Sequence, residues 1–167
     1  MKTIYLVRHA KSSWDFPDLD DFQRPLSSRG KSDAPRMGKY LHDQHIHPDL
    51  VVSSPAERAI KTAKKVAAEL GIDKREIITD KSVYHAWPDR LLKVIVELDD
   101  QHTSVMLFGH NPGLTEFANQ LAGASIENIP TAGAVGISFE VNYWRDIGYE
   151  AGKLLFFHYP KGLPEGY

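Results

Sequence analysis

The regular alternation of short apolar runs with longer amphipathic segments constrains the fold of this chain more than any other feature of its sequence. The apolar runs predict strands at residues 3–8, 49–53, 76–79 and 104–109. The segments between and after them predict helices at residues 33–45, 55–70, 88–99 and 112–122. Two late strands, expected at residues 133–141 and 152–159, predict an antiparallel hairpin at one edge. The pattern predicts an α/β fold, a three-layer α/β/α sandwich whose central sheet is mostly parallel and has an antiparallel edge near the C-terminus.

Length and composition narrow the class further. A chain of 167 residues with 42% hydrophobic content predicts a single domain over residues 1–167. The net charge of -2 gives no general attraction to nucleic acid or to an anionic membrane. No apolar run approaches about 18 residues and no signal peptide is recognisable, so we expect a cytoplasmic protein. The absence of cysteine excludes disulfides, thiolate zinc sites and a cysteine nucleophile, which leaves histidine among the few covalent nucleophiles.

Charged and polar side chains follow three of the expected strands where each strand ends. Arg8-His9 comes directly after the first strand, Ser53 to Arg58 follows the second, and Gly109-His110-Asn111 follows the fourth. Ligands of parallel α/β sheets bind in the crevice outside the carboxyl ends of the strands. We therefore expect the two arginines and two histidines of these segments to meet in one crevice.

The helix starts beside this crevice are expected to supply backbone N–H groups. Ser54-Pro55-Ala56-Glu57 has the pattern of a capping box with proline at the first helical position, which would place Arg58 in the first turn. Asn111-Pro112 repeats the arrangement after His110. Asp33, before Ala34-Pro35, is the expected start of the helix after the first strand. Helix N-termini bind anions, so the crevice is predicted to be an anion pocket.

A phosphoryl group is the guest that these side chains suit best. Guanidinium groups bind phosphoryl oxygens in a bidentate manner, and fixed cationic donors stabilise the charge that develops when phosphoryl is transferred. A neutral His9, held through one ring nitrogen, could attack phosphorus with the other and form a phosphohistidine that water then hydrolyses. His110 would bind the phosphoryl oxygens as an imidazolium. Neither a metal nor a cofactor is expected.

The segment Lys11 to Leu26 is too long for an ordinary connection, and we expect it to border the substrate entrance. Lys11 and Ser12 are candidate pocket residues, although loop residues are often merely solvated. Asn111 is explained by helix capping and is also a candidate for ligand contact. Trp14 is either a platform for the substrate or part of a lid.

Three motifs together resemble the histidine phosphatase superfamily, also called phosphoglycerate mutase-like. They are Leu6-Val7-Arg8-His9-Ala10, Ser53 to Ala59, and Gly109 to Gly113. The chain looks like the short SixA-type phosphohistidine phosphatases, since it lacks room for the large insertions of the mutases. The resemblance implies that His9 is the phosphorylated nucleophile, that Arg8, Arg58 and His110 bind phosphate, and that the substrate is phosphohistidine in a protein or a small phosphorylated molecule.

Two departures from the family pattern bear on the chemistry. Ala10 stands where glycine is usual, which requires an ordinary backbone conformation and is expected to narrow the approach slightly. The stretch Val83 to Asp89 lacks the glutamate that donates a proton to the leaving oxygen in many members. An imidazole leaves far more readily than an alkoxide, so the missing acid favours an N–P substrate over an O–P substrate. His85, Asp89 and Asp15 are the possible substitute acids, and His85 is also a candidate substrate-binding residue.

Other interpretations of the sequence remain. The activity could be directed at small phosphoesters, or the pocket could belong to a non-catalytic module that recognises phosphate. Asp18-Leu19-Asp20 mimics the motif of magnesium-dependent aspartyl phosphatases, but it follows Phe16-Pro17 instead of a buried strand. The cluster of His42, His45 and His47 superficially suggests a metal site, yet its spacing is more typical of a solvated helix end.

Overall fold

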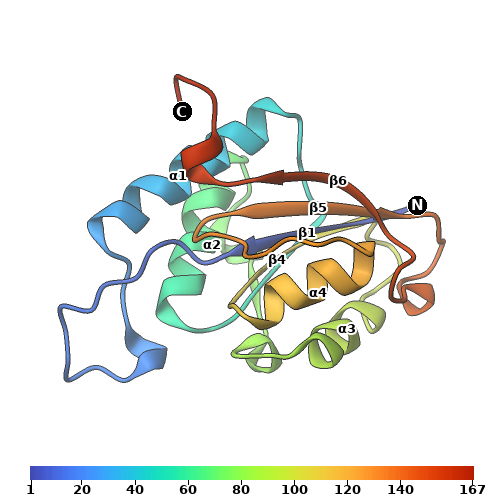
Figure 1. The fold of residues 1–167 in the computed structure, drawn as a ribbon, viewed down its shortest axis with the longest axis horizontal. Coiled ribbons are helices and arrows are strands. Elements are labelled where there is room, and N and C mark those ends of the chain that lie inside the picture. Colours follow the sequence, from blue (N-terminus) through green and yellow to red (C-terminus); the bar gives the residue numbers. More distant parts are fainter.

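A computed structural model describes residues 1–167 as one sheet flanked by helices (Figure 1). The sheet has six strands in the order β3-β2-β4-β1-β5-β6. Along the chain the strands are β1 (Lys2–Arg8), β2 (Leu50–Ser53), β3 (Ile78–Thr79), β4 (Ser104–Gly109), β5 (Ala134–Phe139) and β6 (Lys153–His158). The α-helices are α1 (Ser28–Asp43), α2 (Glu57–Glu69), α3 (Pro88–Val96) and α4 (Gly113–Ala122). None of the four helices combines the length and apolar character that crossing a bilayer requires.

The strand pairing confirms the predicted mixed sheet. β3, β2, β4 and β1 pair in parallel, whereas β5 is antiparallel to both β1 and β6. In the β1–β4 register, Arg8 lies opposite Gly109. Because both strands run in the same direction, the residues that follow them, His9 and His110, emerge side by side at the carboxyl edge of the sheet.

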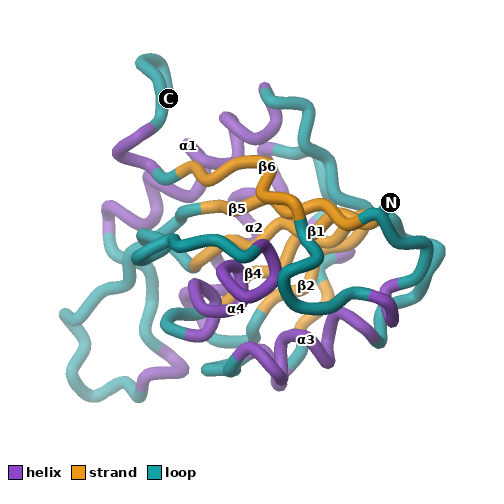
Figure 2. The backbone as a smooth tube through the Cα atoms, turned by 45° about the vertical axis from the view of Figure 1, so that its right-hand side comes forward, coloured by secondary structure: helices purple, strands orange, loops and turns teal.

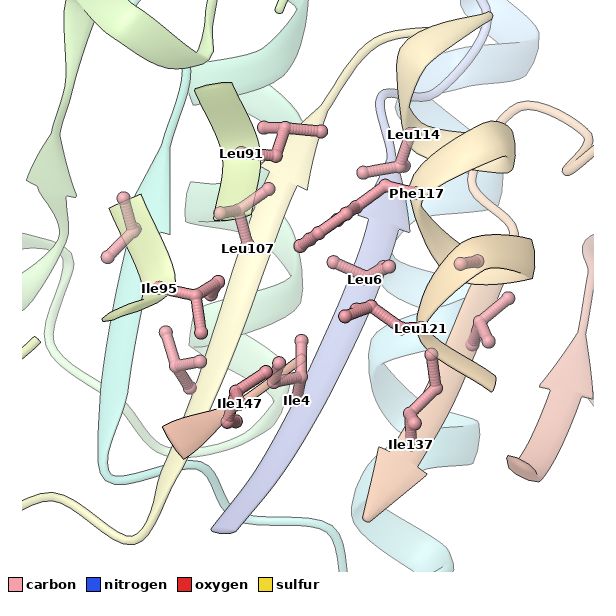
Figure 3. Packing of buried hydrophobic residues seen from close by; sticks show 14 of the residues in the cluster. Ile4, Leu6, Leu91, Ile95, Leu107, Leu114, Phe117, Leu121, Ile137 and Ile147 are labelled. Carbon is pink, nitrogen blue, oxygen red and sulfur yellow. The ribbon is translucent and has the colours of Figure 1, made fainter. Parts of the chain in front are cut away.

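Two apolar cores hold the layers together. They lie between the sheet and the helices that flank it, α3 and α4 on one face and α1 and α2 on the other (Figures 1 and 2). Side chains alternate between them along each strand, as the two-residue period of a strand requires. Ile4 and Leu6 of β1 pack in the core under α3 and α4, while Val7 packs in the core under α1 and α2. Figure 3 shows Phe117 and Leu121 of α4 facing β1 and β5 in the first of these cores. This packing fixes the strands whose ends carry the charged residues.

Three predicted helix starts were wrong. α1 begins at Ser28, with Ser27 accepting a hydrogen bond from the N–H of Gly30, so Asp33 lies inside the helix, where it contacts two arginines of the same helix. α2 begins at Glu57, and its capping position, Ala56, makes no side-chain bond. α4 begins at Gly113, with Pro112 and not Asn111 at the capping position.

Candidate active site

The four residues expected in the pocket lie together at the carboxyl edge of the sheet. His9, Arg58 and His110 are buried and Arg8 is partly buried. The ring centroids of His9 and His110 are 5.3 Å apart. Arg58, in the first turn of α2, is close enough to act electrostatically on Arg8, His9 and His110. The structure therefore brings together the two guanidinium groups and two imidazoles that follow three separate strands.

The His9 ring is held in one orientation and kept neutral. Its Nδ1 lies 2.8 Å from the carbonyl oxygen of Ala10, which can only accept, so Nδ1 carries the proton and donates it. The other nitrogen, Nε2, then keeps its lone pair. Burial, with added repulsion from Arg58 and Arg8, lowers the pKa of His9 to about 3 even though the bond to Ala10 opposes the shift. At neutral pH the ring is therefore neutral and oriented, with a free lone pair on Nε2.

Backbone contacts fix the segment that carries this ring. The N–H of Ala10 donates to Thr62 Oγ1, which itself donates to the carbonyl of Arg58, so β1 and α2 are tied together beside the pocket. Across the sheet the N–H of Ala132 lies 3.1 Å from the carbonyl oxygens of both Arg8 and His9. Ala10 is fully buried in a small apolar cluster with Leu26, Ala34 and Ala132, so its methyl group contributes to packing. The position of Ala10 does not support the expectation that its methyl group narrows the approach to the pocket.

His110 is also neutral in this structure, unlike the imidazolium expected from the sequence. Its Nε2 lies 2.7 Å from Ser54 Oγ, and its Nδ1 is buried without a partner. Burial, helped by the nearby His9 and Arg58, lowers the pKa of His110 to about 2. A bound dianion would favour the charged ring, because an opposite charge at contact distance raises the pKa of an imidazole.

Unpartnered donors indicate where an anion would sit. Arg8 donates from Nη1 to the carbonyl of Ile129 at 3.0 Å, but its Nε is buried and unpartnered, as is His110 Nδ1. Buried polar atoms are normally hydrogen-bonded, so these two atoms are available to bind a ligand. The pocket thus offers a guanidinium N–H and an imidazole nitrogen to a small oxyanion.

Two residues of the loop between β1 and α1 belong to the site and were not identified from the sequence. Asp21, in the 3-10 turn η1 (Asp21–Gln23), accepts bonds from Arg58 through its backbone oxygen at 2.5 Å and through Oδ2 at 2.9 Å. Arg24 is buried, contacts Asp21 Oδ1 at 3.2 Å and lies 3.3 Å from the Trp14 ring. In Figure 1 this loop extends past the end of β1, at the lower left. The loop therefore contacts Arg58 of the pocket, although no motif marks these two residues.

The other candidate site residues divide between pocket and surroundings. His85 lies at the mouth, with Nε2 3.4 Å from Arg58 Nη2 and its ring centroid 5.3 Å from that of His110. Ser12 is buried but accepts from Arg24 Nη2, and Lys11 is exposed with its carbonyl bound to Ser27. The side-chain amide of Asn111 is hydrogen-bonded to Asn128, Ile129 and Thr115.

The substitute acids can be placed in the same way. The carboxylate of Asp89 accepts a bond from the Tyr149 hydroxyl at 2.7 Å, and Asp15 is exposed on the loop. Neither contacts any of the four pocket residues. Asp21 is the one carboxylate that does, so the carboxylate nearest the mouth is not one that the sequence indicated.

A cavity of about 340 Å³ opens beside His110 and is lined by His85, Trp87, Asn111 and their neighbours. A larger hollow of about 510 Å³, between β2, β3 and α3, includes none of the four pocket residues. Of the four pocket residues, His110 alone lines the smaller cavity, which therefore adjoins the pocket without enclosing it. No group of three or more His, Asp, Glu or Cys side chains is arranged to hold a metal ion. His42 lies in the last turn of α1, and His45 and His47 follow that helix.

Comparison with known proteins places these features in context. A model of the histidine phosphatase superfamily (branch 1) matches residues 4–84, a segment that includes Arg8, His9 and Arg58 but ends before His110. An uncharacterised chloroplastic protein of Arabidopsis thaliana is 32% identical over 153 residues, which cover 87% of this chain and 70% of that protein.

Solved structures resemble the whole chain. A SixA protein of Agrobacterium tumefaciens, provisionally described as a phosphohistidine phosphatase, is 28% identical and has a TM-score of 0.81, with 95% of this chain and 98% of that chain covered. A protein histidine phosphatase SixA in complex with tungstate has a TM-score of 0.82 at 18% identity, with 97% and 99% covered. The second likeness shows the fold alone.

Proposed function

The chain belongs to the histidine phosphatase superfamily and has the fold of its SixA-type members, and from that premise we propose that it hydrolyses phosphohistidine in proteins through a phosphorylated His9. The observation that carries the proposal is the state of His9. The ring is buried, neutral and tied through Nδ1, so that Nε2 is free to act among Arg8, Arg58 and His110. A non-catalytic phosphate module would have no need of an oriented nucleophile.

The reaction proceeds in two displacements at phosphorus. In the first, His9 Nε2 forms a bond to phosphorus while the bond to the leaving atom breaks and its electron pair stays on that atom. In the second, a water oxygen attacks phosphorus, the Nε2–P bond breaks, and the proton of the water is lost to solvent as phosphate forms. The arginines and His110 stabilise the equatorial oxygens in both steps.

The lack of a carboxylic acid that could protonate a leaving group favours a substrate with an N–P bond. No carboxylic acid stands at the mouth, because Asp21 is paired with Arg58 and both Asp15 and Asp89 lie elsewhere. An alkoxide needs a proton to leave, whereas an imidazole does not need one on the departing atom if its other nitrogen is protonated. The name of the Agrobacterium tumefaciens relative accords with this substrate class.

Exposed aromatic side chains favour a protein over a small molecule. Trp14 and Phe16 of the loop are 73% and 54% exposed, and Trp87, which lines the cavity beside His110, is 60% exposed. Large exposed apolar side chains that surround a site are typical of surfaces that bind another macromolecule. A phosphohistidine carried on a protein surface would present both its phosphoryl group and apolar neighbours to this rim.

A direct comparison of substrates tests the proposal. We expect a higher kcat/KM for a phosphohistidine peptide than for an alkyl phosphate, and a smaller gap for nitrophenyl phosphate, whose leaving group is acidic. Equal turnover of alkyl and nitrophenyl phosphates, with chemistry limiting, would contradict the proposal by requiring a general acid. Stoichiometric binding without turnover of any of the three would identify a recognition module instead.

A further inference from the structure

Asp21 is the one carboxylate in contact with the phosphate pocket, and the proposed mechanism assigns it no role. Its Oδ2 lies 2.9 Å from Arg58 Nη2, 2.6 Å from the Tyr84 hydroxyl and 3.1 Å from His85 Nε2. Three groups thus converge on a single oxygen. A carboxylate beside a site for a phosphoryl dianion is electrostatically unfavourable, so its presence calls for a compensating interaction.

Asp21 lies at the more exposed side of Arg58, toward which a leaving group can depart. His9 and the Arg58 side chain are buried, with 4% of the Arg58 side chain exposed, while 41% of the Asp21 side chain is exposed. In-line displacement places the leaving atom opposite the nucleophile. Because His9 is buried while the side chains of Asp21 and His85 are partly exposed, a leaving group directed toward solvent would pass close to Asp21 and His85.

The carboxylate is ionised and remains so. Partial burial acts to raise the pKa of Asp21, but hydrogen bonds from Tyr84 and Arg58 outweigh it and hold the pKa well below its usual range. Burial and the bond to Asp21 raise the pKa of Tyr84 to about 12, so the phenol stays a donor. Asp21 therefore cannot protonate a leaving oxygen, but it can accept a hydrogen bond from a leaving group that carries an N–H.

An imidazole already occupies this position in the unliganded protein. His85 presents Nε2 at 3.1 Å from the Asp21 carboxylate while its ring stacks on Tyr84, with centroids 4.1 Å apart. The His85 side chain is 52% exposed, so a change of rotamer would move it into solvent. Oδ1 of Asp21 has Arg24 as its one partner and keeps acceptor capacity. An incoming imidazole thus finds both a ring to stack on and a carboxylate.

We propose that Asp21 determines leaving-group specificity by accepting a hydrogen bond from the distal N–H of the departing imidazole. The inference rests on the proposed phosphohistidine activity. As His9 Nε2 bonds to phosphorus, the substrate N–P bond breaks and its electron pair returns to the departing nitrogen. The substrate leaves as a neutral imidazole that keeps the proton on its distal nitrogen, and Asp21 stays ionised throughout. Phosphate esters have no such N–H and gain nothing from Asp21.

The test compares kcat/KM for a phosphohistidine peptide with kcat/KM for nitrophenyl phosphate in the variant Asp21→Asn. This substitution keeps the shape of the side chain and removes its charge. We expect kcat/KM for a phosphohistidine peptide to fall at least tenfold more than kcat/KM for nitrophenyl phosphate. Asp18→Asn is the matched control, because it removes one charge from the same loop at an exposed residue for which the structure gives no side-chain hydrogen bond or ion pair. Asp18→Asn should leave kcat/KM unchanged for both substrates. Asp21→Ser should change the ratio of the two kcat/KM values in the same direction. Binding of inorganic vanadate reports whether the anion pocket of each variant is intact.

The outcomes separate this inference from the proposed function. An equal loss with both substrates would show that Asp21 merely positions Arg58, and an equal gain would show that it merely obstructs the pocket. Either result, or an unchanged ratio, overturns the inference and leaves the proposed function standing. A wild-type protein that hydrolyses nitrophenyl phosphate but not the phosphohistidine peptide overturns both.

Discussion

Acidification from pH 7 to pH 5 should destabilise the unliganded protein through His9 and His110. In the folded state the pKa values of these rings are about 3 and about 2, so both stay neutral at pH 5. In the unfolded chain each has a pKa near 6.5 and becomes protonated. The unfolded state then binds protons that the folded state does not, so stability is complete above about pH 6.5 and is lost as the pH falls toward the folded values.

The size of this loss follows from the same values. Each ring lowers the free energy of unfolding by about 1.4 kcal/mol for each pH unit below 6.5, which amounts to about 2 kcal/mol at pH 5. The two rings together lower it by about 4 kcal/mol. Urea unfolding at both pH values, in buffers without oxyanions, measures the difference in the free energy of unfolding. His9→Asn and His110→Asn should each reduce that difference by about 2 kcal/mol. Variants that keep the full wild-type pH dependence would refute the conclusion that these rings are buried in neutral form.

Three further predictions follow from the pocket and its supports. Vanadate should bind more tightly than phosphate, because the site complements a trigonal-bipyramidal transition state; equal affinities by calorimetry would count against catalysis. Turnover of nitrophenyl phosphate should survive excess chelator, since Arg8, Arg58 and His110 supply the charge that a metal would supply; a loss restored by magnesium would contradict this. Gly113→Ala should destabilise the fold by about 2 kcal/mol or more in urea unfolding, because a Cβ would lie 1.9 Å from the Ala86 carbonyl oxygen, and wild-type stability would show that this contact relaxes freely.

The sequence predicted the parts of the site that depend on strand topology. Once the apolar runs were identified as parallel strands, Arg8, His9 and His110 had to meet, because strand ends in a parallel sheet share one edge. Arg58 followed from the helix start after β2, even though α2 begins two residues later than the capping pattern indicated. The mixed sheet and its antiparallel edge were predicted for the same reason.

Features that depend on tertiary contacts could not be predicted in this way. Asp21 and Arg24 sit in a loop without periodicity, and only the folded chain brings Asp21 to Arg58, 37 residues away. The protonation state of His110 depends on its burial, which the residues around it in sequence do not reveal. Ser54 appeared to be a helix cap, yet its hydroxyl lies against His110 and accepts from the N–H of Ala56 before the helix begins.

Trapping the phosphoenzyme tests the central claim about His9 most directly. Rapid acid-free quenching during turnover of nitrophenyl phosphate should yield a phosphorylated protein that is labile to acid, with the phosphoryl group on His9 by peptide mapping. His9→Ala should give no phosphoenzyme and no turnover while it still unfolds cooperatively and binds vanadate, since His9 supports little of the apolar core. Full turnover in His9→Ala, or a phosphoryl group on any other residue, would contradict the account.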